Sequence, residues 1–93
     1  MFQDIYTKED YIIEVLFSQH ALDVMTKREI SKALVFDVLQ TYSLKVSISD
    51  VEEHYFGEID DAGSRCLKVV FNPKTRNVIT VYFDRNMRKK GCK

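Results

Sequence analysis

The 93-residue sequence predicts one α+β domain over residues 1–93, in which helices pack on one face of a β-sheet. Two observations lead to this prediction. Helical and strand-like segments come in blocks instead of alternating along the chain, and the last third alternates side chains as strands do. We expect a strand, two helices and then an antiparallel meander of three strands. No repeat or linker divides the sequence, so we expect a core over about residues 11–88 and a basic tail over residues 85–93.

The N-terminal region predicts one strand. Residues 1–10 have a mixed composition, which predicts a loose entry or a short helical turn. Tyr11–Phe17 is rich in β-branched and aromatic residues, which favours a strand. Ile12, Val15 and Leu16 also have the spacing of one helical face, so a helix remains the alternative for this segment.

Two serines mark the starts of the two predicted helices. Ser18 can cap a short helix over about residues 19–27, because its hydroxyl accepts hydrogen bonds from the free amides of the first turn. Ser31 is the corresponding cap of a longer helix that ends at about Thr41. Apolar residues recur in each helix at the spacing of one buried stripe: Ala21, Leu22 and Met25 in the first, and Leu34, Val35, Val38, Leu39 and Tyr42 in the second.

The rest of the chain predicts strands joined by turns. Residues 46–59 are strand-like, with a bend near Ser49-Asp50 and a glycine-containing turn after them. Arg65–Asn72 and Val78–Asp84 alternate, and the turn Asn72-Pro73-Lys74 joins them. Alternation assigns the side chains of each strand to two opposite faces. On the first strand one face carries Leu67, Val69 and Phe71, and the other carries Cys66, Lys68 and Val70. On the second strand one face carries Ile79, Val81 and Phe83, and the other carries Val78, Thr80 and Tyr82. The tail is expected to fray.

Composition argues against several classes of protein. No apolar run approaches the roughly 18 residues that span a membrane. The first residues lack the regions of a signal peptide, so we expect a cytoplasmic protein without membrane contact. In that compartment Cys66 and Cys92 are expected to be two reduced thiols. We expect no metal and no cofactor, because cysteine and histidine are few and no glycine-rich phosphate loop is present.

Charge is distributed unevenly along the chain although the net charge is zero. Residues 1–64 hold 5 Lys and Arg against 13 Asp and Glu, whereas residues 65–93 hold 9 against 1. Such polarity fits a basic face that binds a polyanion, or a partner that matches the two halves. Compensation of charge within the fold is the alternative.

One pattern resembles a known family. Ser18-x-His20-Ala21-x-x-x-Met25-x-x-Arg28-x-Ile30-Ser31 is similar to the opening signature of the domain-of-unknown-function family four-two-five-eight. The similarity continues through the helix after Ser31 and through the segments 67–73 and 78–82, and it covers about Tyr11 to Arg88.

Members of that family are similar to the RelE and BrnT ribonuclease toxins in predicted architecture. The resemblance therefore implies a RelE/BrnT-like fold, an endoribonuclease of toxin type, and RNA and an antitoxin-like protein as partners. The sequence departs from the family at Val24, where members often carry Arg, and at Glu29, where Gly is common. The missing cation at position 24 favours the alternative of a non-catalytic module that binds a protein or nucleic acid.

The residue types fit RNA cleavage without a metal ion, which requires a base, an acid and a cation. His20 can transfer a proton, and Arg28 can clamp a phosphate about two helical turns away. If the last two strands pair in a suitable register, Lys68 and Thr80 share a face, and Tyr82 adds a hydroxyl. We assign the catalytic candidates as His20, Arg28, Lys68, Thr80 and Tyr82, and the substrate-binding candidates as Arg65, Arg85 and Arg88.

Each candidate also has a structural interpretation. His20 can cap backbone groups or pack, and Arg28 can pair with Glu29 or another surface acid. Thr80 and Tyr82 are ordinary strand residues, and Lys68 and His54 fit solvated positions. A symmetric homodimer formed through an exposed strand edge is a third function class.

Overall fold

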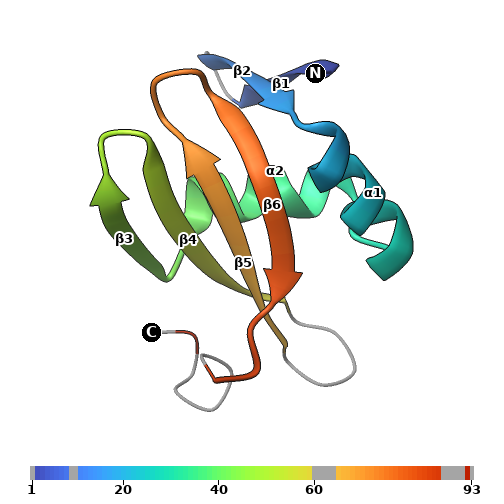
Figure 1. Ribbon diagram of the computed structural model, residues 1–93, viewed down its shortest axis with the longest axis vertical. Coiled ribbons are helices and arrows are strands. Elements are labelled where there is room, and N and C mark those ends of the chain that lie inside the picture. Colours follow the sequence, from blue (N-terminus) through green and yellow to red (C-terminus); the bar gives the residue numbers. More distant parts are fainter. Residues whose placement is uncertain (1, 9–10, 60–64, 87–91, 93) are drawn as a thin grey trace.

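The computed structural model describes residues 2–8, 11–59, 65–86 and 92. Over these residues six strands form one sheet in the order β1-β2-β6-β5-β4-β3, with the helices α1 and α2 packed against it (Figure 1). The elements are β1 (Phe2–Lys8), β2 (Tyr11–Phe17), α1 (Gln19–Arg28), α2 (Lys32–Thr41), β3 (Leu44–Ser49), β4 (Glu52–Ile59), β5 (Arg65–Asn72) and β6 (Asn77–Phe83). No helix in these ranges is long and apolar enough to cross a membrane.

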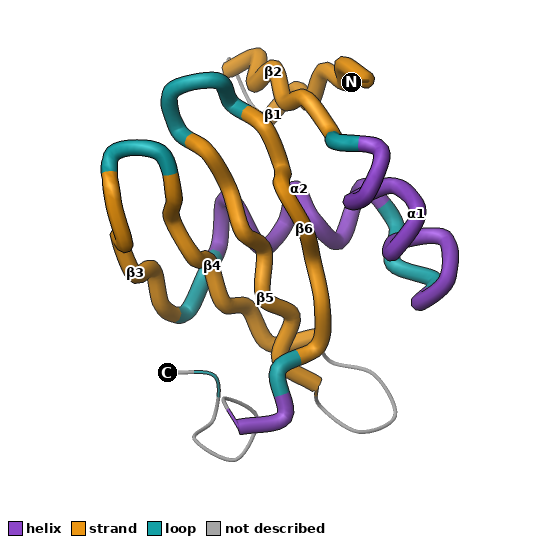
Figure 2. Tube along the Cα trace, viewed as in Figure 1, coloured by secondary structure: helices purple, strands orange, loops and turns teal. Residues whose placement is uncertain are grey.

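In the described part of the chain, α1 and α2 cover one face of the sheet, and neither lies on the other face. In Figure 2, α2 lies behind the strands and α1 lies beside β6. The core between the layers is built from Val15 and Phe17 of β2, the buried sides of both helices, and Leu67, Val69, Val78 and Val81 of the last two strands. Phe36, outside the predicted stripe of α2, is also buried and lies edge-on to Phe17 at 6.0 Å. The expected α+β class, with helices on one face, is confirmed.

Both predicted helix caps are confirmed. The Ser18 hydroxyl accepts from the amide of Ala21 at 3.0 Å, and the Ser31 hydroxyl accepts from the amide of Leu34 at 3.2 Å. Helix α1 ends where Glu29 adopts a left-handed conformation, with φ 56°. Glycine adopts this conformation at no steric cost, whereas the side chain of a glutamate makes it less favourable.

The N-terminal prediction needs a correction. Residues 2–8 are neither a loose entry nor a helical turn; they form β1, which pairs antiparallel with β2 over its whole length. Tyr11–Phe17 is a strand, and the helical alternative is wrong, because this segment pairs with β1 and also runs parallel to β6 at Leu16 and Phe17. The mixed composition of residues 2–8 does not indicate a strand, because β1 is stabilised by its pairing with β2.

The strand order also differs from the expected three-stranded meander. The bend near Ser49-Asp50 is a full turn that separates β3 from β4, so four antiparallel strands follow the helices. A register shift between Val70 and Phe71 pairs Val70 with Thr80 and Phe71 with Val78, which leaves Ile79 as the extra residue of a bulge. Val78 is consequently buried in the helix-facing core, on the opposite side from the one that strict alternation predicts.

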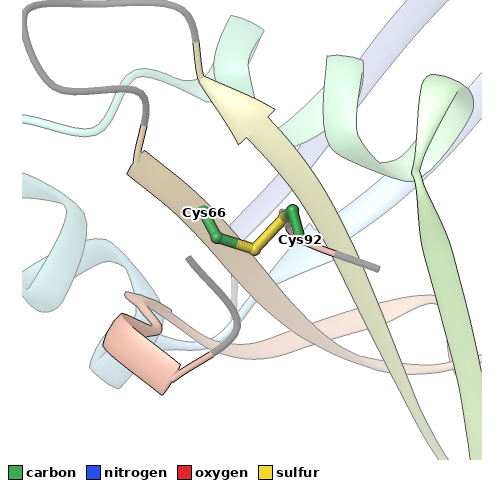
Figure 3. Close-up of a disulfide and its surroundings, with 2 residues drawn as sticks. All are labelled: Cys66 and Cys92. Atoms are coloured by element: carbon green, nitrogen blue, oxygen red, sulfur yellow. A yellow bond between two sulfur atoms is a disulfide. The ribbon is translucent and has the colours of Figure 1, made fainter. Parts of the chain in front are cut away.

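The prediction of two reduced thiols is wrong, because Cys66 and Cys92 form a disulfide (Figure 3). β6 returns antiparallel to β5, so the chain leaves β6 next to Cys66, and the amide of Asp84 donates to the Cys66 carbonyl at 2.9 Å. Both cysteines are about 1% exposed and form a small cluster with Phe56 and Leu44 on the face without helices. Residue 92 of the expected frayed tail is thus anchored to the sheet, while residues 87–91 and 93 lie outside the described residues.

Candidate functional site

The face of the sheet without helices presents two rows of side chains across β4, β5 and β6. The backbone pairs His54–Val70 and Val70–Thr80 define the first row. The pairs Phe56–Lys68 and Lys68–Tyr82 define the second. Directly paired residues in antiparallel strands point to the same side of a sheet, so the six side chains share this face, which we call the open face. The register of β5 and β6 therefore places Lys68 and Thr80 on one face, as the expected site requires.

His20 reaches the edge of the open face from α1. Its Nε2 lies 3.2 Å from the hydroxyl of Thr80 on β6, and the side chain is exposed. Ser18 fixes the start of α1 against the same strand, because its hydroxyl also donates to the carbonyl of Ile79 at 2.9 Å. A helix cap and a helix-to-strand hydrogen bond thus hold the imidazole over Thr80. His20 does not pack in the core.

Lys68 and Tyr82 form the second polar pair of this face. The Lys68 ammonium donates to the Tyr82 hydroxyl at 2.7 Å and lies 5.1 Å from the centroid of the Tyr82 ring and 5.6 Å from that of Phe56. Because the Tyr82 oxygen accepts from Lys68, its own O–H is free to donate to a ligand. Thr80 and Tyr82 are two residues apart on one strand, so their Cα atoms are about 7 Å apart.

Three arginines line a groove near the start of β5 and the end of β6. Arg28 of α1, Arg65 of β5 and Arg85 after β6 line this groove of about 540 Å³, together with Cys66, Tyr82, Phe83 and Asp84. The guanidinium of Arg65 stacks on the ring of Phe83 at 3.9 Å. Arg65 and Phe83 lie on the helix-facing side of the sheet, and Tyr82 is the residue that the groove shares with the open face. Among the described residues Arg28 belongs to none of the ion pairs, and the backbone amide of Glu29 ends α1 by donating to the carbonyls of Met25 and Thr26.

Part of this chain matches a known protein family. A family model described as a domain of unknown function (DUF4258) matches residues 17–83, from the last residue of β2 through β6. The chain belongs to this family. No curated protein and no solved structure matches the chain. The DUF4258 region contains His20, Arg28, Arg65, Lys68, Thr80 and Tyr82; it begins after β1 and ends before Arg85.

The predicted site residues of this DUF4258 protein fall into two adjoining groups. The pairs His20–Thr80 and Lys68–Tyr82 lie on or at the edge of the open face, whereas Arg28, Arg65 and Arg85 line the groove, which Tyr82 also lines. Arg88 lies outside the described residues. Their proximity depends on the pairing of β5 with β6 and on the placement of α1 along β6, neither of which a local pattern contains.

Sequence reasoning set His54 aside as a solvated strand residue, but the structure gives it a specific partner. Its Nε2 lies 2.6 Å from the Glu52 carboxylate, and its side chain is only 17% exposed. It occupies the same face as Lys68 and Thr80. The available signal was the spacing of Glu52 and His54, two apart in a strand, which puts both side chains on one face.

A second charged cluster lies on the helix-facing side of β3 and β4, away from the candidate site. The Tyr55 hydroxyl donates to Glu53 at 2.8 Å, and Lys45 lies 3.4 Å from the other Glu53 oxygen. Burial raises the pKa of the Tyr55 phenol, and the hydrogen bond and charge of Glu53 raise it further. Attraction to Tyr55 raises the pKa of Lys45; desolvation of Lys45 lowers this pKa, and attraction to Glu53 raises it again, with a net upward shift. This cluster orders the edge of the sheet.

Proposed function

We propose that this protein is a metal-independent endoribonuclease of toxin type, related in architecture to the RelE and BrnT toxins. The observation that supports this most is that Tyr82 belongs to two groups: it accepts from Lys68 on the face that His20 borders, and it lines a groove with three arginines. A polyanion can lie in the groove while one of its phosphates reaches the open face.

Each residue then has a role in transesterification. His20 takes the proton of the ribose 2′-hydroxyl, and Thr80 holds its imidazole in place. Lys68 and the free O–H of Tyr82 stabilise the charge that develops on the phosphorane oxygens. Arg28 clamps a neighbouring phosphate, for which a guanidinium is suited by its two parallel donors. Arg65 and Arg85 extend this contact along the strand of RNA.

The test is cleavage of a mixed-sequence RNA in EDTA. We expect the wild type to cleave, and His20→Ala to lose between about 10²- and 10⁴-fold in rate, the usual contribution of a general base. Lys68→Met keeps the apolar stem over Phe56 and removes the charge, so a loss of similar size is expected. Arg28→Ala should chiefly weaken RNA binding. Its matched control is Lys27→Ala, an exposed cation one residue away on the same helix that does not line the groove.

The non-catalytic alternative makes a different prediction. A binding module of the same fold would retain RNA or a protein partner in the arginine groove without cleaving it. Tight RNA binding by the wild type, lost in Arg28→Ala, together with no cleavage by any variant, would support that alternative. Cleavage that is unchanged in His20→Ala would refute the proposed site.

A further inference from the structure

A single histidine leaves the proposed reaction incomplete. In-line cleavage of RNA places the attacking 2′-oxygen and the leaving 5′-oxygen on opposite sides of the phosphorus. One group must therefore remove a proton on one side while a second group supplies a proton on the other. The open face holds a second histidine that the roles above leave unused.

His20 and His54 stand on opposite sides of Val70. Thr80, which contacts His20, pairs with Val70, and Val70 pairs with His54. Figure 1 shows β5 between β4 and β6. Two strand spacings therefore separate Thr80 from His54, which puts their Cα atoms about 10 Å apart. In the transition state, the phosphorus carries two apical oxygens. If each of these is hydrogen-bonded to a ring nitrogen at about 2.8 Å, the two nitrogens are separated by a similar length. Lys68 and Tyr82 lie in the adjacent row, beside the position that such a phosphate would occupy.

The contact with Glu52 determines which ring nitrogen of His54 can face a substrate. An ionised carboxylate only accepts hydrogen bonds, so the contact at 2.6 Å puts a proton on Nε2 and directs Nδ1 elsewhere. Gln40 Nε2 and Asn77 Oδ1 are the buried side-chain polar atoms without a partner in the described part of the chain. Nδ1 of His54 has no partner among the described residues and is not one of these atoms, so it is not fully buried, and the side chain as a whole is 17% exposed. The carboxylate also balances the charge of the imidazolium that holds the proton to be donated.

On the basis of the ribonuclease function proposed above, we propose that His54 is the general acid of this site, oriented by Glu52, and that His20 is the general base. The 2′-oxygen forms a bond to phosphorus as its proton passes to His20. The bond from phosphorus to the 5′-oxygen breaks, and that oxygen receives the proton on Nδ1 of His54. The products are a 2′,3′-cyclic phosphate and a 5′-hydroxyl, and water in the next step restores both histidines.

The experiment compares two forms of one substrate. An oligonucleotide that contains a cleaved site is made with the natural 5′-oxygen or with sulfur at that bridging position. A thiolate leaves without protonation, so it needs no acid. We expect His54→Ala to slow cleavage of the oxygen substrate by about 10²- to 10⁴-fold and that of the sulfur substrate by less than about tenfold. His20→Ala should slow both substrates.

Further variants separate catalysis from folding. His54→Gln keeps a donor for Glu52 and cannot transfer a proton, so it should behave as His54→Ala does with an intact fold. Glu52→Gln should slow the oxygen substrate selectively, whereas Glu58→Gln, an exposed carboxylate of the same strand, should not. If the His54 variants lost equal activity on both substrates, or lost none, His54 would not be the general acid. The proposed ribonuclease function would still stand. Failure of the wild type to cleave either substrate in EDTA would overturn the ribonuclease function and this role with it.

Discussion

Reduction of the Cys66–Cys92 disulfide should destabilise the protein by an amount that the structure allows us to calculate. The bond joins residues 26 apart in sequence. Closing a loop of this size in the unfolded chain removes entropy worth about 3.5 kcal/mol at 25 °C. A protein of this size unfolds with a urea slope of about 1–1.5 kcal/mol per M, so the midpoint should fall by about 2.3–3.5 M when a reductant is present.

Urea unfolding followed by far-ultraviolet circular dichroism measures this effect, since the chain has no tryptophan to report it. The matched control is the double variant Cys66→Ala, Cys92→Ala, whose midpoint should not respond to the reductant. A thiol titration of the oxidised, unfolded chain should find no free thiol. Two free thiols would contradict the disulfide itself. A change below about 1 kcal/mol, with the bond present before reduction, would refute the loop-entropy estimate.

Three further perturbations test the packing of the fold by the same unfolding assay. A Cβ at Gly57 would lie 2.8 Å from Cγ2 of Val38 on α2, so Gly57→Ala should lower the free energy of unfolding by about 1–3 kcal/mol. In a double-mutant cycle with Val38→Ala, a coupling energy below about 1 kcal/mol would contradict this contact. Ser18→Ala removes both a helix cap and a bond to β6 and should cost about 1–2 kcal/mol; a smaller loss would mean that α1 needs neither. The unfolded chain releases the Tyr55 proton near pH 10 and the folded chain holds it to higher pH, so stability should fall as the pH rises above 10; an unchanged fall in Tyr55→Phe would assign it to other groups.

The pattern of local signals accounts for much of the fold. Ser18 and Ser31 predict the starts of both helices because a cap depends on residues three positions apart. The turn at Asn72 is equally local: its side-chain oxygen accepts from the amides of Lys74 and Thr75 at 3.0 and 3.3 Å. The candidate site was only partly predictable. His20 and Arg28 were recognisable as residue types, but the pairing of Glu52 with His54 was visible only as a spacing.

The sequence by itself determined the helices, the central strands and the share of apolar residues on their inner faces, because these follow from side-chain preferences over a few residues. The tertiary structure alone decided the strand character of residues 2–8, the bulge that turns Val78 inward and the meeting of Cys66 with Cys92. It also decided that His20, Lys68 and His54 share one region. Each of these depends on contacts between segments distant in sequence, whose free energy is gained only when the whole sheet has formed.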